Sequence, residues 1–244
     1  MLHPQARAAL AEEEGELPVQ DPSNTIAAQR AEATAAAHAE PREDVAVVRD
    51  LDADGVPVRL YRPVEGGDPL PVIVHLHGGG FVFNDIDVHD AVVRRLANRS
   101  GMAVVSVDYR RPPEHKFPAA PDDVDAVLAW LGREGAELGL DPARVVAHGD
   151  SAGGNLALVA ALRNPGRLAA LVLLYPFIDA QMRHASYDEA IGLWNRDEAA
   201  WYWEQYARTV DDYADPDFSP YESDRLDTLP PTLVITCEHD PLRD

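Results

Sequence analysis

Length, composition and charge narrow the class of this protein before any motif is considered. The chain has 244 residues, of which 46% are hydrophobic, so it can bury a full core and is predicted to form an α/β domain. Its net charge of −21, with Lys116 as the only lysine, predicts neither nucleic acid nor an anionic membrane as a partner, because both repel an acidic surface. The longest apolar run, residues 168–178, is too short to span a bilayer.

The N-terminal residues and the single cysteine predict a cytoplasmic location. The first residues lack a basic stretch followed by an apolar one, which a secretion signal requires. Cys237 has no second cysteine with which to form an intrachain disulfide. Because it follows a strand-like run, Cys237 is expected to be a small buried apolar residue.

The N-terminal part predicts a helix and then a hairpin. Residues 1–43 are rich in Ala and Glu, and Ser23 or Asn24 could cap a helix that runs to about His38. Alternating residues over 45–61, divided by an Asp-Ala-Asp-Gly turn, predict an antiparallel hairpin.

From Pro71 onwards, apolar runs alternate with helix patterns. Strands are predicted at residues 72–74, 103–107, 145–148, 168–174 and 232–236. Helices are predicted from Asp87 to about Asn98, with Gly101 closing that helix, and from Pro121 to about Glu134. Such alternation predicts a parallel sheet with helices on both faces.

Residues 178–222 interrupt this alternation. Asn195, with Glu198 three positions later, is typical of a helix start. Tyr202, Trp203, Tyr206 and Val210 then recur on one helix face, and Trp194 and Trp201 lie nearby. These aromatic residues could line a pocket, but packing within the segment is the favoured interpretation.

The most informative stretch is Gly149-Asp150-Ser151-Ala152-Gly153, which lies between a strand and a helix. Glycine two positions to either side of the serine allows a turn so sharp that a side chain would collide with the neighbouring strand or helix. The turn would lift the Ser151 hydroxyl above the sheet, at the start of a helix. Taken alone, the motif fits a nucleophile and an ordinary tight turn equally well.

Gly78, Gly79 and Gly80 follow an earlier strand and favour the nucleophile. Consecutive glycines expose backbone N–H groups, which can stabilise the oxyanion that forms in acyl transfer. A phosphate-binding loop is the alternative, but no Gly-Lys-Ser/Thr follows, and Phe81 and Phe83 would line a phosphate site poorly. Acyl transfer also needs an acid after a later strand. Asp240 is the best candidate, and Glu238 and Asp244 are weaker ones.

In combination these motifs resemble the hormone-sensitive-lipase-like family of α/β-hydrolases, most of which are microbial esterases. The resemblance covers the chain from about residue 45 and rests on residues 77–81, 108–110, 113–120, 149–155 and 240–244. It implies Ser151 as nucleophile and Asp240 as triad acid. It also implies an oxyanion hole formed by the N–H groups of Gly79, Gly80 and Ala152.

The resemblance also implies a domain organisation. Residues 1–43 and 178–222 would form a helical cap, and residues 44–177 and 223–244 would form the α/β-hydrolase core. The chain departs from the family where Arg111-Pro112 replaces a usual Leu-Ala pair, a change to which the sequence assigns little mechanistic weight.

A second departure concerns the catalytic histidine, which in the family lies some thirty residues past the acid. This chain has four residues after Asp240, so we expect the last strand, the last helix and the histidine loop to be missing. His239 should point away from its neighbour Asp240, His77 should brace its loop, and His148 should serve in packing or a local hydrogen bond. Without a final strand, the edge at residues 232–236 could pair with a second copy and form a homo-oligomer.

The sequence therefore predicts a carboxylic-ester hydrolase that acts on short to medium acyl esters through an acyl-enzyme. It predicts no metal and no organic cofactor, and a small-molecule ester as the partner. The alternative is a non-catalytic small-molecule binding module on the same scaffold, which the missing histidine would suit.

Overall fold

A seven-stranded sheet organises the computed structural model, which describes residues 2–12, 17–21, 23–190 and 195–244. Its order is β1-β2-β4-β3-β5-β6-β7. β1 and β2 form the predicted antiparallel hairpin. The other strands, in sheet order β4, β3, β5, β6 and β7, run parallel to one another. The strands are β1 (Val47–Ala53), β2 (Val56–Arg62), β3 (Leu70–Leu76), β4 (Ala103–Val107), β5 (Leu140–Asp150), β6 (Ala170–Leu174) and β7 (Thr232–Ile235).

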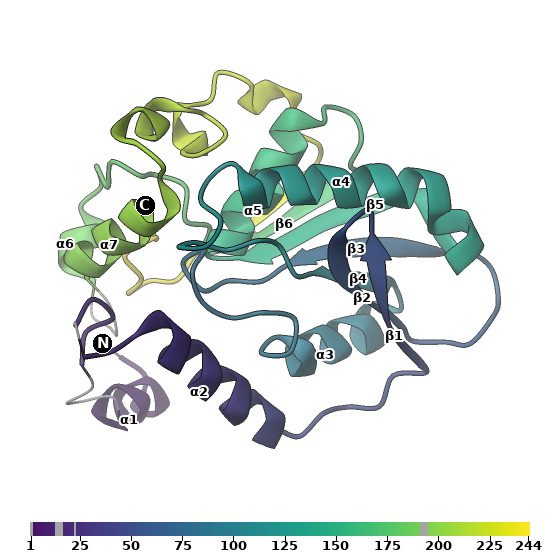
Figure 1. The fold of residues 1–244 in the computed structure, drawn as a ribbon, viewed down its shortest axis with the longest axis horizontal. Helices are drawn as coiled ribbons and strands as arrows, with labels where there is room; N and C mark the ends of the chain where they lie inside the picture. Colours follow the sequence, from purple (N-terminus) through teal and green to yellow (C-terminus); the bar gives the residue numbers. More distant parts are fainter. Residues whose placement is uncertain (1, 13–16, 22, 191–194) are drawn as a thin grey trace.

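The α-helices are α1 (Pro4–Glu12), α2 (Ile26–Ala39), α3 (Asp90–Ser100), α4 (Ala119–Glu134), α5 (Ala152–Arg163), α6 (Ser186–Glu189) and α7 (Arg196–Tyr206). Short 3-10 turns occupy Gly135–Leu138, Val210–Ala214, Pro220–Glu222 and Leu226–Thr228. Figure 1 shows α4 and α5 on one face of the sheet, α3 on the other, and α1, α2, α6 and α7 gathered at one end. Within the described residues, no helix has the length and apolarity that crossing a bilayer requires.

Side-chain alternation along the strands explains why helices cover both faces. Val72 and Val74 of β3 belong to the larger core, whereas Ile73 between them belongs to a smaller one. The smaller core also contains Val93 and Ala97 of α3, so this helix covers that face. The middle of the sheet is therefore buried on both sides, as continuous apolar strands predict.

Three predicted helix starts were wrong by a few residues, and one of these is α4, which begins at Ala119 rather than Pro121. Thr25, rather than Ser23 or Asn24, caps α2 and accepts a hydrogen bond from the Ala28 N–H at 3.2 Å. α3 begins at Asp90 rather than near Asp87. The reason is a turn in which the Asp85 carboxylate accepts the N–H groups of residues 87 and 88, so the chain enters the helix later. Gly101 closes α3 in the left-handed conformation, as predicted.

The helix predicted within residues 178–222 begins where expected but is shorter than expected. Asn195 and Glu198 form a capping box at the start of α7. Trp203 and Tyr206 are fully buried, which confirms packing as their role. α7 ends at Tyr206, however, so Val210 lies beyond it and is 80% exposed rather than on the shared face. Trp194 lies outside the described residues.

β7 is the last strand of the sheet and is poorly covered. Leu233, Val234 and Ile235 are 53%, 51% and 45% exposed. Cys237 follows this edge strand and is exposed, so the prediction that it is buried was wrong. A local apolar run could not reveal this, because exposure depends on which elements cover the strand.

A buried carboxylate joins α3 to the hairpin. Asp90 is fully buried and accepts hydrogen bonds from Tyr61 Oη at 2.6 Å and from Arg94 Nε at 2.7 Å. Arg42 approaches the same carboxylate at 3.3 Å. Burial by itself would raise the pKa of Asp90, but these partners outweigh it and hold the pKa below its usual range.

We expect Asp90→Asn to lower the free energy of unfolding at pH 7 by about 3 to 5 kcal/mol, because it removes a buried counter-charge from partly buried arginines. Since the folded-state pKa is depressed, this stabilisation is present above a pH of about 4 and is lost as the pH falls through the folded-state pKa. Urea unfolding at several pH values measures both effects.

Asp50→Asn is the matched control, because Asp50 also pairs with an arginine, Arg59, but its side chain is 68% exposed. The control should cost at most about 1 kcal/mol. Equal losses in the two variants would contradict a special role for the buried carboxylate.

Candidate active site

Ser151 lies in a strained turn between strand and helix. β5 ends at Asp150 and α5 begins at Ala152, so one residue makes the whole reversal. Ser151 has a φ of 52°, a region that non-glycine residues rarely adopt. Its N–H donates to the Leu174 carbonyl at 2.9 Å, and its carbonyl accepts the Phe177 N–H at 3.0 Å. These bonds hold the strained residue, and its side chain stays partly exposed.

The glycines on either side of Ser151 are required by close approach. A Cβ on Gly153 would collide with the Leu76 carbonyl of β3, and one on Gly149 would collide with the Gly153 carbonyl. These collisions are the steric reason, predicted from the sequence, for a glycine two positions to either side of Ser151. The turn can form only where backbone meets backbone with no side chain between them.

The glycine loop follows β3 and lies against this turn. The Gly78 N–H donates to the Asp150 carboxylate at 3.2 Å, which ties the loop to the residue before Ser151. Gly79 and Gly80 both have positive φ, and in the described chain neither of their N–H groups donates a hydrogen bond. The Ala152 N–H, in the first turn of α5, has no intrahelical acceptor. The three predicted oxyanion-hole donors thus belong to two segments in direct contact.

Three side chains, those of His77, Tyr109 and Asn84, hold the glycine loop in place. The His77 ring contacts the Gly78 carbonyl at 2.9 Å, and Tyr109 Oη donates to the His77 carbonyl at 2.7 Å. His77 therefore braces the loop, as predicted. Asn84 Nδ2 donates to the Gly78 carbonyl at 3.2 Å from the far side of the loop.

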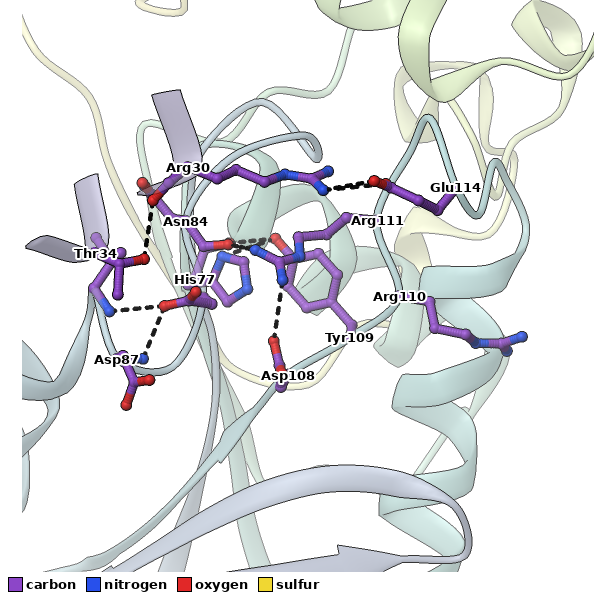
Figure 2. A network of polar contacts seen from close by, with 12 residues as sticks. Arg30, Thr34, His77, Asn84, Asp87, Asp108, Tyr109, Arg110, Arg111 and Glu114 are labelled. Atoms are coloured by element: carbon purple, nitrogen blue, oxygen red, sulfur yellow. Dashed lines mark hydrogen bonds and ion pairs between the residues drawn. The ribbon is translucent and has the colours of Figure 1, made fainter. Parts of the chain in front are cut away.

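Two arginines also hold the loop, a role that sequence analysis did not predict for either of them. Arg111 donates to the Asn84 carbonyl and lies 3.7 Å from the Asp108 carboxylate (Figure 2). Arg30 of α2 donates to the carbonyls of Val82 at 2.9 Å and Pro112 at 2.6 Å. Figure 2 also shows its ion pair with Glu114. The Arg111-Pro112 departure therefore contributes contacts that hold the glycine loop, and no local sequence signal pointed to them.

Aromatic side chains of α7 cover the same loop. The rings of Tyr206 and Phe81 stack with centroids 3.9 Å apart, and Trp203 lies 4.3 Å from Phe177. A Cβ on Gly80 would meet the ring of Tyr202. The glycine loop is therefore enclosed between the sheet and the segment that interrupts the core.

Asp240 lies in the loop after β7, as predicted, but the structure does not link it to Ser151. Its carboxylate accepts the Leu242 N–H at 2.8 Å, and burial raises its pKa above the usual value. His239 is close to Glu238, with its Nε2 3.9 Å from that carboxylate. In the part of the chain that the structure describes, no histidine forms a hydrogen bond or ion pair with Ser151 or Asp240.

A serine in a strained strand–helix turn, beside a glycine loop on a mostly parallel sheet, defines the class of α/β-hydrolases. The comparison with known families agrees, because the alpha/beta hydrolase fold family matches residues 73–244. The chain belongs to this family.

Curated relatives include esterases of several bacteria. Carboxylesterase NlhH of Mycobacterium tuberculosis is 41% identical over 209 residues, which cover 80% of this chain and 65% of the relative. Ethyl acetate hydrolase of Pseudomonas putida is 37% identical over 202 residues, covering 79% of this chain and 64% of the relative. The chain thus spans just under two thirds of the length of these relatives.

Solved structures give the same result. A hyperthermophilic esterase from the archaeon Pyrobaculum calidifontis superposes with a TM-score of 0.89 at 38% identity, covering 100% of this chain and 82% of that one. An esterase from Pseudomonas putida superposes with a TM-score of 0.90 at 31% identity, covering 100% and 80%.

We expect Gly153→Ala to lower the free energy of unfolding by about 3 kcal/mol or more, because the added methyl group meets a backbone carbonyl that cannot move away. Gly101→Ala is the matched control. At Gly101 open space surrounds the missing Cβ, although its φ of 68° is one that L residues rarely adopt. The control should cost only about 1 kcal/mol. Thermal unfolding of both variants measures the difference, and a Gly153→Ala loss as small as the control's would contradict the close approach.

Proposed function

We propose that this chain is the core of a carboxylic-ester hydrolase in which Ser151 is the nucleophile. The observation that carries the proposal is the positive φ of Ser151 beside a loop whose Gly79 and Gly80 N–H groups donate no hydrogen bond in the described chain. Strain of this kind persists where the surrounding structure enforces it, and it is concentrated at functional sites. The esterase names of the relatives also support the proposal.

In the proposed reaction, Ser151 Oγ attacks the ester carbonyl carbon while a base takes the hydroxyl proton. The carbonyl oxygen becomes an oxyanion, which the N–H groups of Gly79, Gly80 and Ala152 stabilise by about 3 to 4 kcal/mol per donor. The intermediate then expels the alcohol, which receives the proton from the protonated base. Water attacks the acyl-enzyme by the same route and releases the carboxylic acid. No step needs a metal or an organic cofactor.

The base should be a histidine that Asp240 orients. None of the nine histidines holds that place among the described contacts, so the source of the base stays a prediction. Experiment can distinguish two sources of this base. One is a histidine of these 244 residues, or of a second copy, that reaches Ser151 in the working state. The other is a histidine outside these residues, as expected from the family resemblance.

The substrate class we propose is short to medium acyl esters. Large aromatic rings of α7 lie over the glycine loop. The preference for short to medium acyl chains is what the family resemblance implies. We assign the cap to residues 1–43 and 178–222, and the core to residues 44–177 and 223–244. A hydrogen bond from the Val19 N–H to Glu198 Oε1 supports joining the two cap segments. A cytoplasmic location remains a prediction of the sequence.

The first test is hydrolysis of p-nitrophenyl butyrate by the 244-residue chain, with Ser151→Ala as the blank. If a base is present, the kcat of the Ser151→Ala blank should lie about 10⁶-fold below that of the parent chain, because the blank lacks the nucleophile. Ser100→Ala, an exposed serine on α3, is the control and should leave the rate unchanged. A rate equal to the blank would place the base outside these residues.

Labelling with a fluorophosphonate then tests the nucleophile itself in a chain extended to the length of the relatives. Labelling should occur at Ser151 and disappear in Ser151→Ala. Labelling at another serine, or at none, would contradict the proposal. The alternative of a binding module without turnover is not favoured, because the relatives are named as hydrolases.

We further propose that the exposed β7 edge pairs with β7 of a second copy. The half-exposed Leu233, Val234 and Ile235 lie on a strand with one free edge, which is a template for strand pairing. Sedimentation should show a dimer that Val234→Lys converts to monomer. Val92→Lys, at an exposed position of α3, should have no effect. A monomeric parent chain would contradict this proposal.

A further inference from the structure

Three histidines and one aspartate gather where β3 and β5 end. The parallel register pairs His75 of β3 with His148 of β5, so both rings lie on the same face of the sheet. His89 immediately precedes α3, the helix that covers this face. Asp150 is the last residue of β5 and precedes Ser151. Two strands and the start of one helix therefore deliver four metal-ligating side chains to one place.

The distances in this cluster resemble those of a metal centre. His75 Nε2 is 3.3 Å from His89 Nδ1, and His89 Nδ1 is 3.8 Å from the Asp150 carboxylate. The ligand atoms of His75, His89 and Asp150 all lie within 4.8 Å of one another. On its other side, His75 Nδ1 is 2.9 Å from His148 Nδ1.

We propose that His75 Nε2, His89 Nδ1 and Asp150 Oδ1 bind a divalent cation of the Zn²⁺ class, with His148 orienting His75. This site is separate from the proposed ester chemistry, which needs no metal.

The geometry fits the proposed cation. Zn²⁺ binds nitrogen and oxygen at about 2.0 to 2.2 Å, so tetrahedral ligand atoms lie about 3.3 Å apart. The two histidine nitrogens already have that separation. Asp150 must approach His89 Nδ1 by about 0.5 Å and must also turn toward His75, since the three ligand atoms now lie within 4.8 Å of one another. Two imidazoles and one carboxylate favour Zn²⁺, Co²⁺, Ni²⁺ or Cu²⁺ over Mg²⁺ or Ca²⁺, which prefer oxygen ligands.

The histidines are in the protonation state that a metal requires. Burial lowers the pKa values of His75, His89 and His148, so the rings are neutral near pH 7 and have a free lone pair. If His75 Nδ1–H donates to His148 Nδ1, then His75 Nε2 is the bare nitrogen that faces His89. Such an outer hydrogen bond is what fixes the tautomer of metal-ligating histidines.

The charge that surrounds the proposed site is mixed. The N-terminus of α3 carries a partial positive charge that disfavours a cation. The Asp150 and Asp85 carboxylates act on His89 in the opposite sense, whereas the Asp108 carboxylate is paired with Arg111. His89 and Asp150 keep side-chain exposures of 13% and 18%, which gives a cation a way in.

A bound cation would connect the elements that position the proposed active site. Asp150 also accepts the Gly78 N–H, so the cation would join β3, the start of α3 and the serine turn to the glycine loop. We therefore expect binding to raise the melting temperature, because a ligand that binds only the folded state stabilises it.

The test is titration of the 244-residue chain with Zn²⁺, followed by calorimetry and by thermal melting. We expect one equivalent to bind and the melting temperature to rise. His89→Asn should weaken binding by about 100-fold or more, and His148→Asn by about 10- to 100-fold. Asparagine suits position 89, because His89 is the N-cap residue of α3 and asparagine is a preferred N-cap. His115→Gln, at an exposed histidine, is the control and should bind as the parent does.

Asp150→Asn gives a second ligand variant, which can still accept the Gly78 N–H while it loses its charge. Equal Zn²⁺ binding by the parent, His89→Asn and Asp150→Asn would overturn the proposal. An equal loss of Zn²⁺ binding in the exposed control, His115→Gln, would also overturn it. For the parent chain alone, anomalous diffraction from Zn²⁺-soaked crystals should give a peak between His75, His89 and Asp150. Peaks only at surface carboxylates or surface histidines would also overturn it.

Discussion

The architecture depends on one chain reversal, in which a single residue passes from β5 to α5. The reversal places the Gly153 backbone against the Leu76 carbonyl of β3, and the Gly149 backbone against Gly153. Both the strand and the helix that meet there are buried, so the reversal cannot relax into solvent. The strain at Ser151 is held by hydrogen bonds to Leu174 and Phe177, which lie in and just after the neighbouring strand.

The glycine loop beside this turn has little regular structure, and other parts of the chain hold it. Arg30 and Arg111 donate to carbonyls in or next to it, and Asp150 accepts one of its N–H groups. A guanidinium presents several donors in a fixed plane, so one side chain can satisfy two backbone carbonyls at once. In a chain with a net charge of −21, arginines that reach inward also offset the carboxylates gathered near the site.

Burial has opposite consequences for the acidic and the imidazole groups of this molecule. Asp90 stays ionised because Tyr61 and Arg94 supply hydrogen bonds that offset its desolvation. His75 lacks such a counter-charge, and for His148 burial outweighs the nearby Asp150 carboxylate, so burial lowers the pKa of both rings. The same sheet face thus holds a charged network at the helix start and a neutral imidazole cluster beside the serine turn.

The sequence by itself determined the fold class, the hairpin, the serine turn and the glycine loop, because these depend on local periodicity and on glycines at fixed spacing. It also located the capping box at Asn195 and the role of His77 as a brace. Only the tertiary structure decided the exposure of Cys237 and Val210, the later start of α3, and the contacts of Arg30 and Arg111. It alone brought His75, His89 and Asp150 together, since strand register and helix placement act between residues far apart in the chain. Such pairings leave no pattern in the local sequence.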